Sequence, residues 1–515
     1  MEQRWLSAGM LSAMLVTGGV PRLDRNETTY TPAGPEATVA GTLLASARGS
    51  SPAVCALAAR AVEGRFGWGG FGPPGLADTS SAIRWALRER PGEDAVPVLL
   101  AGVADPDDCV RQISARLIAR AESPSAAKGL VQALSSSAAA TREAASLALG
   151  MGDMASGLTP LIQRLEDAVA EVRAVAAWAL GSIDDTRAAP PLRRVLRDDA
   201  AGVRAAAALA LGRLDDSSAV SGLAQLLRND PDDRVRLAAA QALGRMKARS
   251  AISALNAGLG DKDAAVRRTC AWALGQFGAP ESLAGLMKAM EDNDGEVREM
   301  AVWAVAQVGN KTAATGPLAR RLNSDERTGV RRQAAWALGE LEDPAAVEPL
   351  SAALRTEQDR EVRSMVVWAL GQFRDSRTAA PLTAALQDSA AKVRGMAAWA
   401  LGQLEPDRAP GALITAVRDS DRDVRKRAAW ALGQIEDPAA VRSLRDAMRD
   451  SDAEVRKTVL WALSRIDSEA AREAIVEQLK SDDPEVRAGA ARSLGSLRNN
   501  PWPWPQPMPQ PRPFP

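Results

Sequence analysis

EDPAAVRSLRDAMRDSDAEVRKTVLWALSRI, the stretch from Glu436 to Ile466, contains two helical patterns separated by a short acidic loop. The first begins at Asp437-Pro438, because aspartate is a good N-cap and proline fits a first turn whose N–H groups are unpaired. An apolar stripe at helical spacing then runs from Val441 to Met448. The second begins near Asp452 and runs through VRKTVLWALSRI. The stretch therefore predicts a helical hairpin.

The same hairpin pattern recurs along most of the 515 residues. Its marker is a Val-Arg pair with a spacing of 31 to 33 residues, and Thr141-Arg142 occupies the same register. The valines are Val110, Val172, Val203, Val235, Val266, Val297, Val330, Val362, Val393, Val424, Val455 and Val486. Two antiparallel helices of this size cannot bury their apolar faces alone, whereas stacked hairpins share a continuous core. We predict an all-α, right-handed solenoid of about 13 to 14 hairpins.

DRDVRKRAAWALGQI, from Asp421 to Ile435, matches the second helix of a known repeat throughout. It resembles HEAT repeats of the bacterial, phycobilisome-lyase-like subtype, and this resemblance covers residues 93–497. The resemblance implies a hydrogen-bonded ladder between repeats, formed by loop aspartates such as Asp419 and Asp421 with the recurring arginine. In the later repeats that arginine is Arg267, Arg298, Arg331, Arg363, Arg394, Arg425 and Arg456.

Four segments are expected along the chain. Residues 1–22 hold an apolar run, 5–20, that resembles a signal peptide or anchor. Residues 23–92 read as degenerate helical repeats or a cap, with a Gly-aromatic loop at 67–75. Residues 93–497 form the solenoid, and 498–515 form a disordered tail rich in proline and tryptophan. The apolar run predicts a periplasmic, extracytoplasmic or membrane-anchored protein, with a helical cap on a cytoplasmic protein as the alternative.

The composition argues against several kinds of chemistry. Lys+Arg and Asp+Glu are 64 each, so bulk attraction to nucleic acid is not expected. There is no histidine, which removes the commonest general base and zinc ligand. Cys55, Cys109 and Cys270 are far apart in sequence and predict neither a disulfide framework nor a metal site. We expect no catalytic residues, no metal and no cofactor.

A tryptophan returns at one position of the second helix. At 100° per residue, Val424, Ala428 and Leu432 share one face, and Trp430 lies about 150° from it. In HEAT solenoids that side lines the concave surface. The row comprises Trp272, Trp303, Trp336, Trp368, Trp399, Trp430 and Trp461, and one turn later come Gln276, Gln307, Gln372, Gln403 and Gln434. Two interpretations remain open: the rings bind a partner, or they lie over the glycine of a neighbouring repeat.

The favoured function is a non-catalytic scaffold that binds an extended peptide or a partner protein on the concave face. The expected partner is a protein or a proline-rich peptide such as the tail itself, because a polyproline II strand loses little entropy on docking. One alternative is a bilin lyase-like or other enzyme-accessory role, for which the sequence shows no diagnostic residue. The other is a structural or regulatory module of the cell envelope.

Overall fold

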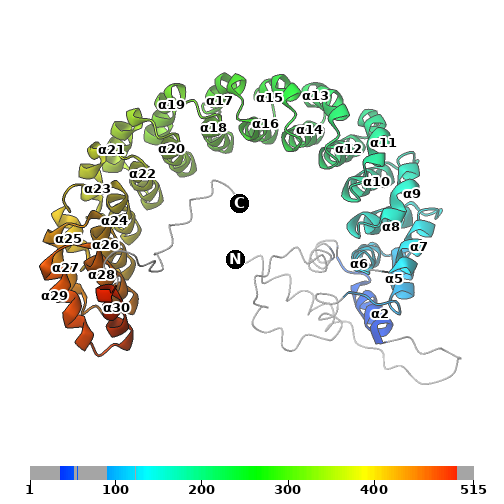
Figure 1. Cartoon of the computed structure of the whole chain (residues 1–515). Helices are drawn as coiled ribbons and strands as arrows, with labels where there is room; N and C mark the ends of the chain where they lie inside the picture. Colours follow the sequence, from blue (N-terminus) through cyan, green and yellow to red (C-terminus); the bar gives the residue numbers. More distant parts are fainter. Residues whose placement is uncertain (1–34, 52–54, 56–89, 122, 496–515) are drawn as a thin grey trace. The chain divides into compact units, whose positions relative to one another are not determined.

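The computed structural model describes residues 35–51, 55, 90–121 and 123–495, and within these ranges the secondary structure is helical without a β-strand. The chain divides into two compact units, Met1–Gly258 and Leu259–Pro515 (Figure 1). The predicted all-α solenoid is confirmed. The apolar segment 1–22, the loop 67–75 and the tail 498–515 lie outside the described residues. No helix in the described part of the chain is both long and apolar enough to cross a membrane.

In the N-terminal unit, first and second helices of successive hairpins alternate. Each second helix packs on its own first helix, and successive second helices within the unit pack on one another. The helices are α2 (Pro35–Ala47), α5 (Val96–Val103), α6 (Asp108–Ile118), α7 (Pro124–Ala133), α8 (Ala139–Met151), α9 (Leu158–Arg164), α10 (Ala170–Ser182), α11 (Ala189–Arg194), α12 (Ala201–Arg213), α13 (Val220–Asn229), α14 (Asp233–Arg245) and α15 (Ile252–Gly258).

The C-terminal unit repeats this arrangement, with the even-numbered helices as second helices (Figure 1). Its helices are α16 (Ala264–Phe277), α17 (Leu283–Ala289), α18 (Gly295–Val308), α19 (Lys311–Ser324), α20 (Thr328–Leu341), α21 (Val347–Thr356), α22 (Arg360–Gln372), α23 (Ala379–Ala385), α24 (Ala391–Leu404), α25 (Gly411–Ala416), α26 (Arg422–Ile435), α27 (Val441–Ala447), α28 (Ala453–Arg465), α29 (Glu469–Glu477) and α30 (Pro484–Gly495). We call the faces built by the two sets the first-helix layer and the second-helix layer.

The helix N-caps lie at or close to the positions that the sequence predicts. Asp452 caps α28 by accepting hydrogen bonds from the backbone N–H groups of Glu454 and Val455. The first helix differs slightly, because Asp437 caps a 3₁₀ turn, Pro438–Ala440, before α27 begins at Val441. The backbone N–H of Ala440 donates to the carbonyl of Asp437 at 3.0 Å, the three-residue bond that defines such a turn.

The cysteines correct one expectation from the sequence. Cys55 and Cys109 form a disulfide, with their Cα atoms 5.4 Å apart, although 54 residues separate them along the chain. The sequence shows no sign of this pairing, because only the folded chain brings the two distant cysteines together. Cys270 is a free thiol, fully buried among apolar neighbours, and burial raises the pKa of that thiol.

Thiol counting tests this assignment. The native chain is expected to show no reactive thiol under non-reducing conditions, because Cys270 is buried and protonated. Unfolding in guanidinium without reductant should release one thiol per chain, and adding reductant should release three. Three reactive thiols without reductant would show that Cys55 and Cys109 are not bonded. The Cys270→Ser variant, with no thiol before reduction, is the control.

Candidate functional site

The tryptophan row of the C-terminal unit is more buried than an exposed binding ladder would be. Trp336, Trp368 and Trp430 are only 5 to 6% exposed. The other four rings, those of Trp272, Trp303, Trp399 and Trp461, are half-buried. Helical arithmetic considers only one helix and does not account for the neighbouring repeat. That neighbour covers the rings.

Five of the seven rings lie against a glycine of the preceding repeat. Trp336 does not, because the equivalent position before it is Ala306. A Cβ atom built on Gly402 would stand 2.6 Å from Cζ3 of Trp430 and 2.9 Å from Cα of Ala431. The same contact joins Gly275 to Trp303, Gly339 to Trp368, Gly371 to Trp399 and Gly433 to Trp461, with Cβ distances of 2.5 to 3.1 Å. The glycine leaves a shallow gap, and the indole fills it. These rings therefore pack between repeats, whatever else they bind.

The polar atoms of this row differ between repeats. The indole N–H of Trp336 bonds to the Glu340 side chain, and burial raises the pKa of that carboxyl. The Nε1 atom of Trp430 is buried and has no hydrogen-bond partner within the described residues. Buried indole N–H groups usually find an acceptor. Trp430 thus keeps one unused donor.

The glutamine row is the accessible part of the same surface. Gln307 and Gln403 are exposed, and Gln276, Gln372 and Gln434 are half-buried. The Nε2 of Gln372 lies 3.4 Å from the carbonyl oxygen of Trp368 one turn earlier. Primary amides offer both donors and acceptors without charge. On α22, α24 and α26, Gln372, Gln403 and Gln434 form an uncharged hydrogen-bonding strip with the half-buried ring of Trp399.

The recurring arginines join consecutive repeats. Arg394 donates from Nε and Nη2 to both carboxylate oxygens of Asp419, each at 2.7 Å. Its Nη1 also donates to the carbonyl of Asp388 in its own loop at 2.9 Å. The seven pairs, with N···O distances of 2.5 to 2.8 Å, are Arg267–Asp292, Arg298–Asp325, Arg331–Glu357, Arg363–Asp388, Arg394–Asp419, Arg425–Asp450 and Arg456–Asp483.

The two loop aspartates have different tasks. Asp419 accepts the arginine of the preceding repeat, whereas Asp421 caps its own helix, α26. Burial alone would raise the pKa of the Asp419 carboxyl. Hydrogen bonds from Arg394 and the backbone N–H of Asp421 outweigh burial and hold that pKa below its usual value. The carboxylate is therefore ionised at neutral pH, and the pair acts as a structural link.

The stacked helical hairpins and the arginine–carboxylate pairs between them define an α-solenoid, and the comparison with family models identifies the repeat. The family model for HEAT repeats matches residues 158–244, 220–306, 283–371, 348–419, 379–463 and 409–495, more than half of the chain. The chain belongs to the HEAT-repeat family. No curated protein sequence matches it significantly.

Solved structures show the same fold in other solenoids. Yeast importin-beta (Kap95p) is 14% identical with a TM-score of 0.52, and the alignment covers 90% of this chain and 73% of that one. Importin beta crystallised in an ammonium sulfate condition is 17% identical with a TM-score of 0.54, covering 78% and 66%. The solenoid of the Kap95:Nup1 complex is 15% identical with a TM-score of 0.53, and the alignment covers 78% of this chain and 67% of that one. The chain thus spans about two thirds of the length of the last two solenoids.

Proposed function

We propose that the chain is a non-catalytic scaffold that binds an extended, proline-rich segment of a partner protein on the second-helix layer of the C-terminal unit. The observation that carries the proposal is the uncharged strip along α22, α24 and α26, in which Gln372, Gln403 and Gln434 flank the half-buried ring of Trp399. Kap95p, a solenoid of the same fold, is described with RanGDP in one structure and with Nup1 in another.

The chemistry of the strip suits such a segment. Proline has a carbonyl acceptor but no backbone N–H, so a proline-rich strand needs donors from its receptor. Gln403 offers an exposed amide, and Gln434 offers a half-buried one. The half-buried ring of Trp399, one turn before Gln403 on α24, gives an apolar surface that suits the flat face of proline. A polyproline II strand is extended before it binds, which lowers the entropic cost.

Other features agree with this role. The chain has no histidine, and no group of three metal-ligating side chains occurs in the described ranges. We keep the phycobilisome-lyase-like subtype as a prediction from sequence, without a catalytic role. We also propose an extracytoplasmic location, because disulfides such as Cys55–Cys109 persist in oxidising compartments.

A peptide titration tests the proposed binding. The probe is a synthetic peptide of residues 501–515, added to a chain that ends at Asn500 and followed by calorimetry. Saturable binding is expected, and the double variant Gln403→Ala/Gln434→Ala should weaken it at least about fivefold, because each lost hydrogen bond costs roughly 1 kcal/mol. Gln403 is exposed and Gln434 is half-buried, so both can change without removing a ring from the packing between repeats.

The matched control is Gln132→Ala/Gln163→Ala, which removes two exposed amides from the first-helix layer of the N-terminal unit. It should leave the affinity unchanged. No saturable heat up to millimolar peptide would reject the proline-rich partner, and an equal loss in both double variants would reject this surface.

A further inference from the structure

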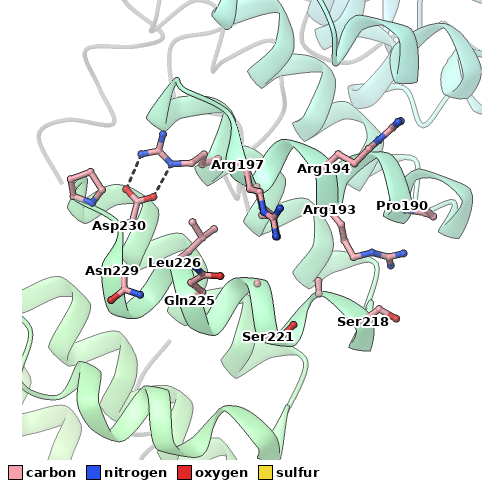
Figure 2. Close-up of a pocket in the computed structure, with 15 residues that line it drawn as sticks. Pro190, Arg193, Arg194, Arg197, Ser218, Ser221, Gln225, Leu226, Asn229 and Asp230 are labelled. Atoms are coloured by element: carbon pink, nitrogen blue, oxygen red, sulfur yellow. Dashed lines mark hydrogen bonds and ion pairs between the residues drawn. The ribbon is translucent and has the colours of Figure 1, made fainter.

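A second surface, on the first-helix layer of the N-terminal unit, has the opposite character. It is a groove of about 890 Å³ between α11 and α13, in two successive repeats (Figure 2). Leu196 and Leu226 supply apolar contacts in the groove. Gly222 lets the two helices approach, since a Cβ there would stand 3.1 Å from Cδ1 of Leu196.

Arginines form one wall of this groove. Arg193 is neutralised by Asp216, with its Nη1 2.7 Å from a carboxylate oxygen. Arg194 and Arg197 are exposed and form no ion pair with any residue in the described ranges. Figure 2 shows Arg197 extending toward α13 and Arg194 projecting from the rim. Two positive charges are thus left without a counterion.

Neutral hydrogen-bonding groups form the facing wall. Ser218, Ser221, Gln225 and Asn229 are all exposed and lie at spacings of three and four residues, which places them on one face of α13 and its leading turn. They offer hydroxyl and amide groups to a backbone lying in the groove. The end of the groove is closed by Arg204, whose Nε and Nη2 donate to Asp230 at 2.7 and 2.8 Å. Arg204 is therefore committed to the inter-repeat ladder.

The charge of this wall is peculiar to its repeat. Counted back from the ladder aspartate, positions five, four and one are all arginine here. The same positions in three other repeats are Thr383, Ala384 and Gln387 in α23 and its loop, Met287, Lys288 and Glu291 at α17, and Arg445, Asp446 and Arg449 at α27. In the last set Arg445 pairs with Glu477 at 2.8 Å. Repeat duplication therefore does not explain the unpaired arginines.

We propose that this groove binds an acidic peptide segment of a partner protein. Arg194 and Arg197 would each receive a carboxylate, for which the planar guanidinium fork is well suited. The serine and amide side chains of α13 would hydrogen-bond the peptide backbone. Two unpaired cations on a chain of zero net charge match a short acidic segment rather than a long polyanion. This surface is separate from the tryptophan and glutamine strip, so the two proposals stand or fall independently.

Fluorescence anisotropy with the full chain tests it. The probe is a fluorescein-labelled peptide, Gly-Ser-Asp-Glu-Glu-Asp-Glu-Ser-Gly, in low salt. The double variant Arg194→Glu/Arg197→Glu should weaken binding at least about tenfold, because like charges then face each other. The control Arg228→Glu/Arg249→Glu makes the same change of charge at exposed arginines outside the groove, and it should alter affinity less than about twofold. Unchanged circular dichroism of both variants excludes unfolding as the cause.

Three results would overturn the proposal. One is the absence of saturable binding by the unaltered chain up to millimolar peptide. Another is an equal loss of affinity in the two double variants, which would indicate net charge alone. The third is tighter binding of a single-stranded DNA of the same charge with the same dependence on Arg194 and Arg197, which would make the groove a nucleic-acid site.

Discussion

The Arg394→Met variant is expected to lose about 3 kcal/mol of unfolding free energy, because removing one partner of a largely buried ion pair leaves the other charge uncompensated. The side chains of Arg394 and Asp419 are only 13% and 11% exposed. The arginine also holds the carbonyl of Asp388 at 2.9 Å, so its loss weakens two connections of one loop. Urea unfolding followed by tryptophan fluorescence measures the change.

Two further variants separate this role from a surface effect. Arg377→Met removes an ion pair with Asp375 in which the arginine is 58% exposed, and it should cost much less than Arg394→Met because water screens an exposed pair. The double variant Arg394→Met/Asp419→Asn should recover part of the loss, since no buried charge then remains unpaired. If Arg394→Met costs no more than Arg377→Met, the ladder does not couple the repeats.

The Gly402→Ala variant is expected to destabilise the C-terminal unit by about 2 kcal/mol through overpacking. The added methyl would stand 2.6 Å from Cζ3 of Trp430 and 2.9 Å from both Cα and Cβ of Ala431. Two of these three atoms belong to the helix itself, so α24 and α26 must move apart. The indole of Trp430 would then shift, which should also change its fluorescence maximum.

Gly41→Ala is the matched control for this change. Gly41 lies inside α2, and a Cβ there meets nothing within 4 Å. Alanine should therefore stabilise that helix by roughly 0.5–1 kcal/mol, because glycine loses more backbone freedom on folding. A loss of unfolding free energy at Gly402 together with a gain at the control position supports packing of the ring on the glycine. Destabilisation of equal size at both positions would contradict it.

The tryptophan row shows where reasoning from sequence stops. Angular position along one helix is a property of that helix, so the sequence alone predicts that Trp430 points away from the face of Val424 and Leu432. Exposure depends on the next helix. Whether Gly402 lies beneath the ring is decided by the stagger of two repeats, and the sequence left packing and binding equally open. The structure shows the packing contact, and partner binding remains a proposal.

The charged residues show the same difference between what the sequence predicts and what the structure decides. The resemblance implied that loop aspartates meet the recurring arginine, but it did not distinguish Asp419, which bridges repeats, from Asp421, which caps a helix. The groove beside Arg197 was missed altogether, although three arginines at positions 193, 194 and 197 were a visible signal. Their number is in the sequence, whereas their lack of partners depends on which side chains the neighbouring repeat supplies.

The sequence by itself determined the helical hairpin, because caps and apolar periodicity act over one or two helical turns. It also determined the repeat period and predicted that the hairpins stack, because the same pattern returns every 31 to 33 residues. Only the tertiary structure decided that Cys55 bonds to Cys109 and that five of the indoles fill gaps over glycine. It also decided that Arg194 and Arg197 form no ion pair with any residue in the described part of the chain. Each of these depends on distances between residues about 25 to 55 positions apart in the chain. Such distances are fixed by how one repeat lies on the next, which no local pattern specifies.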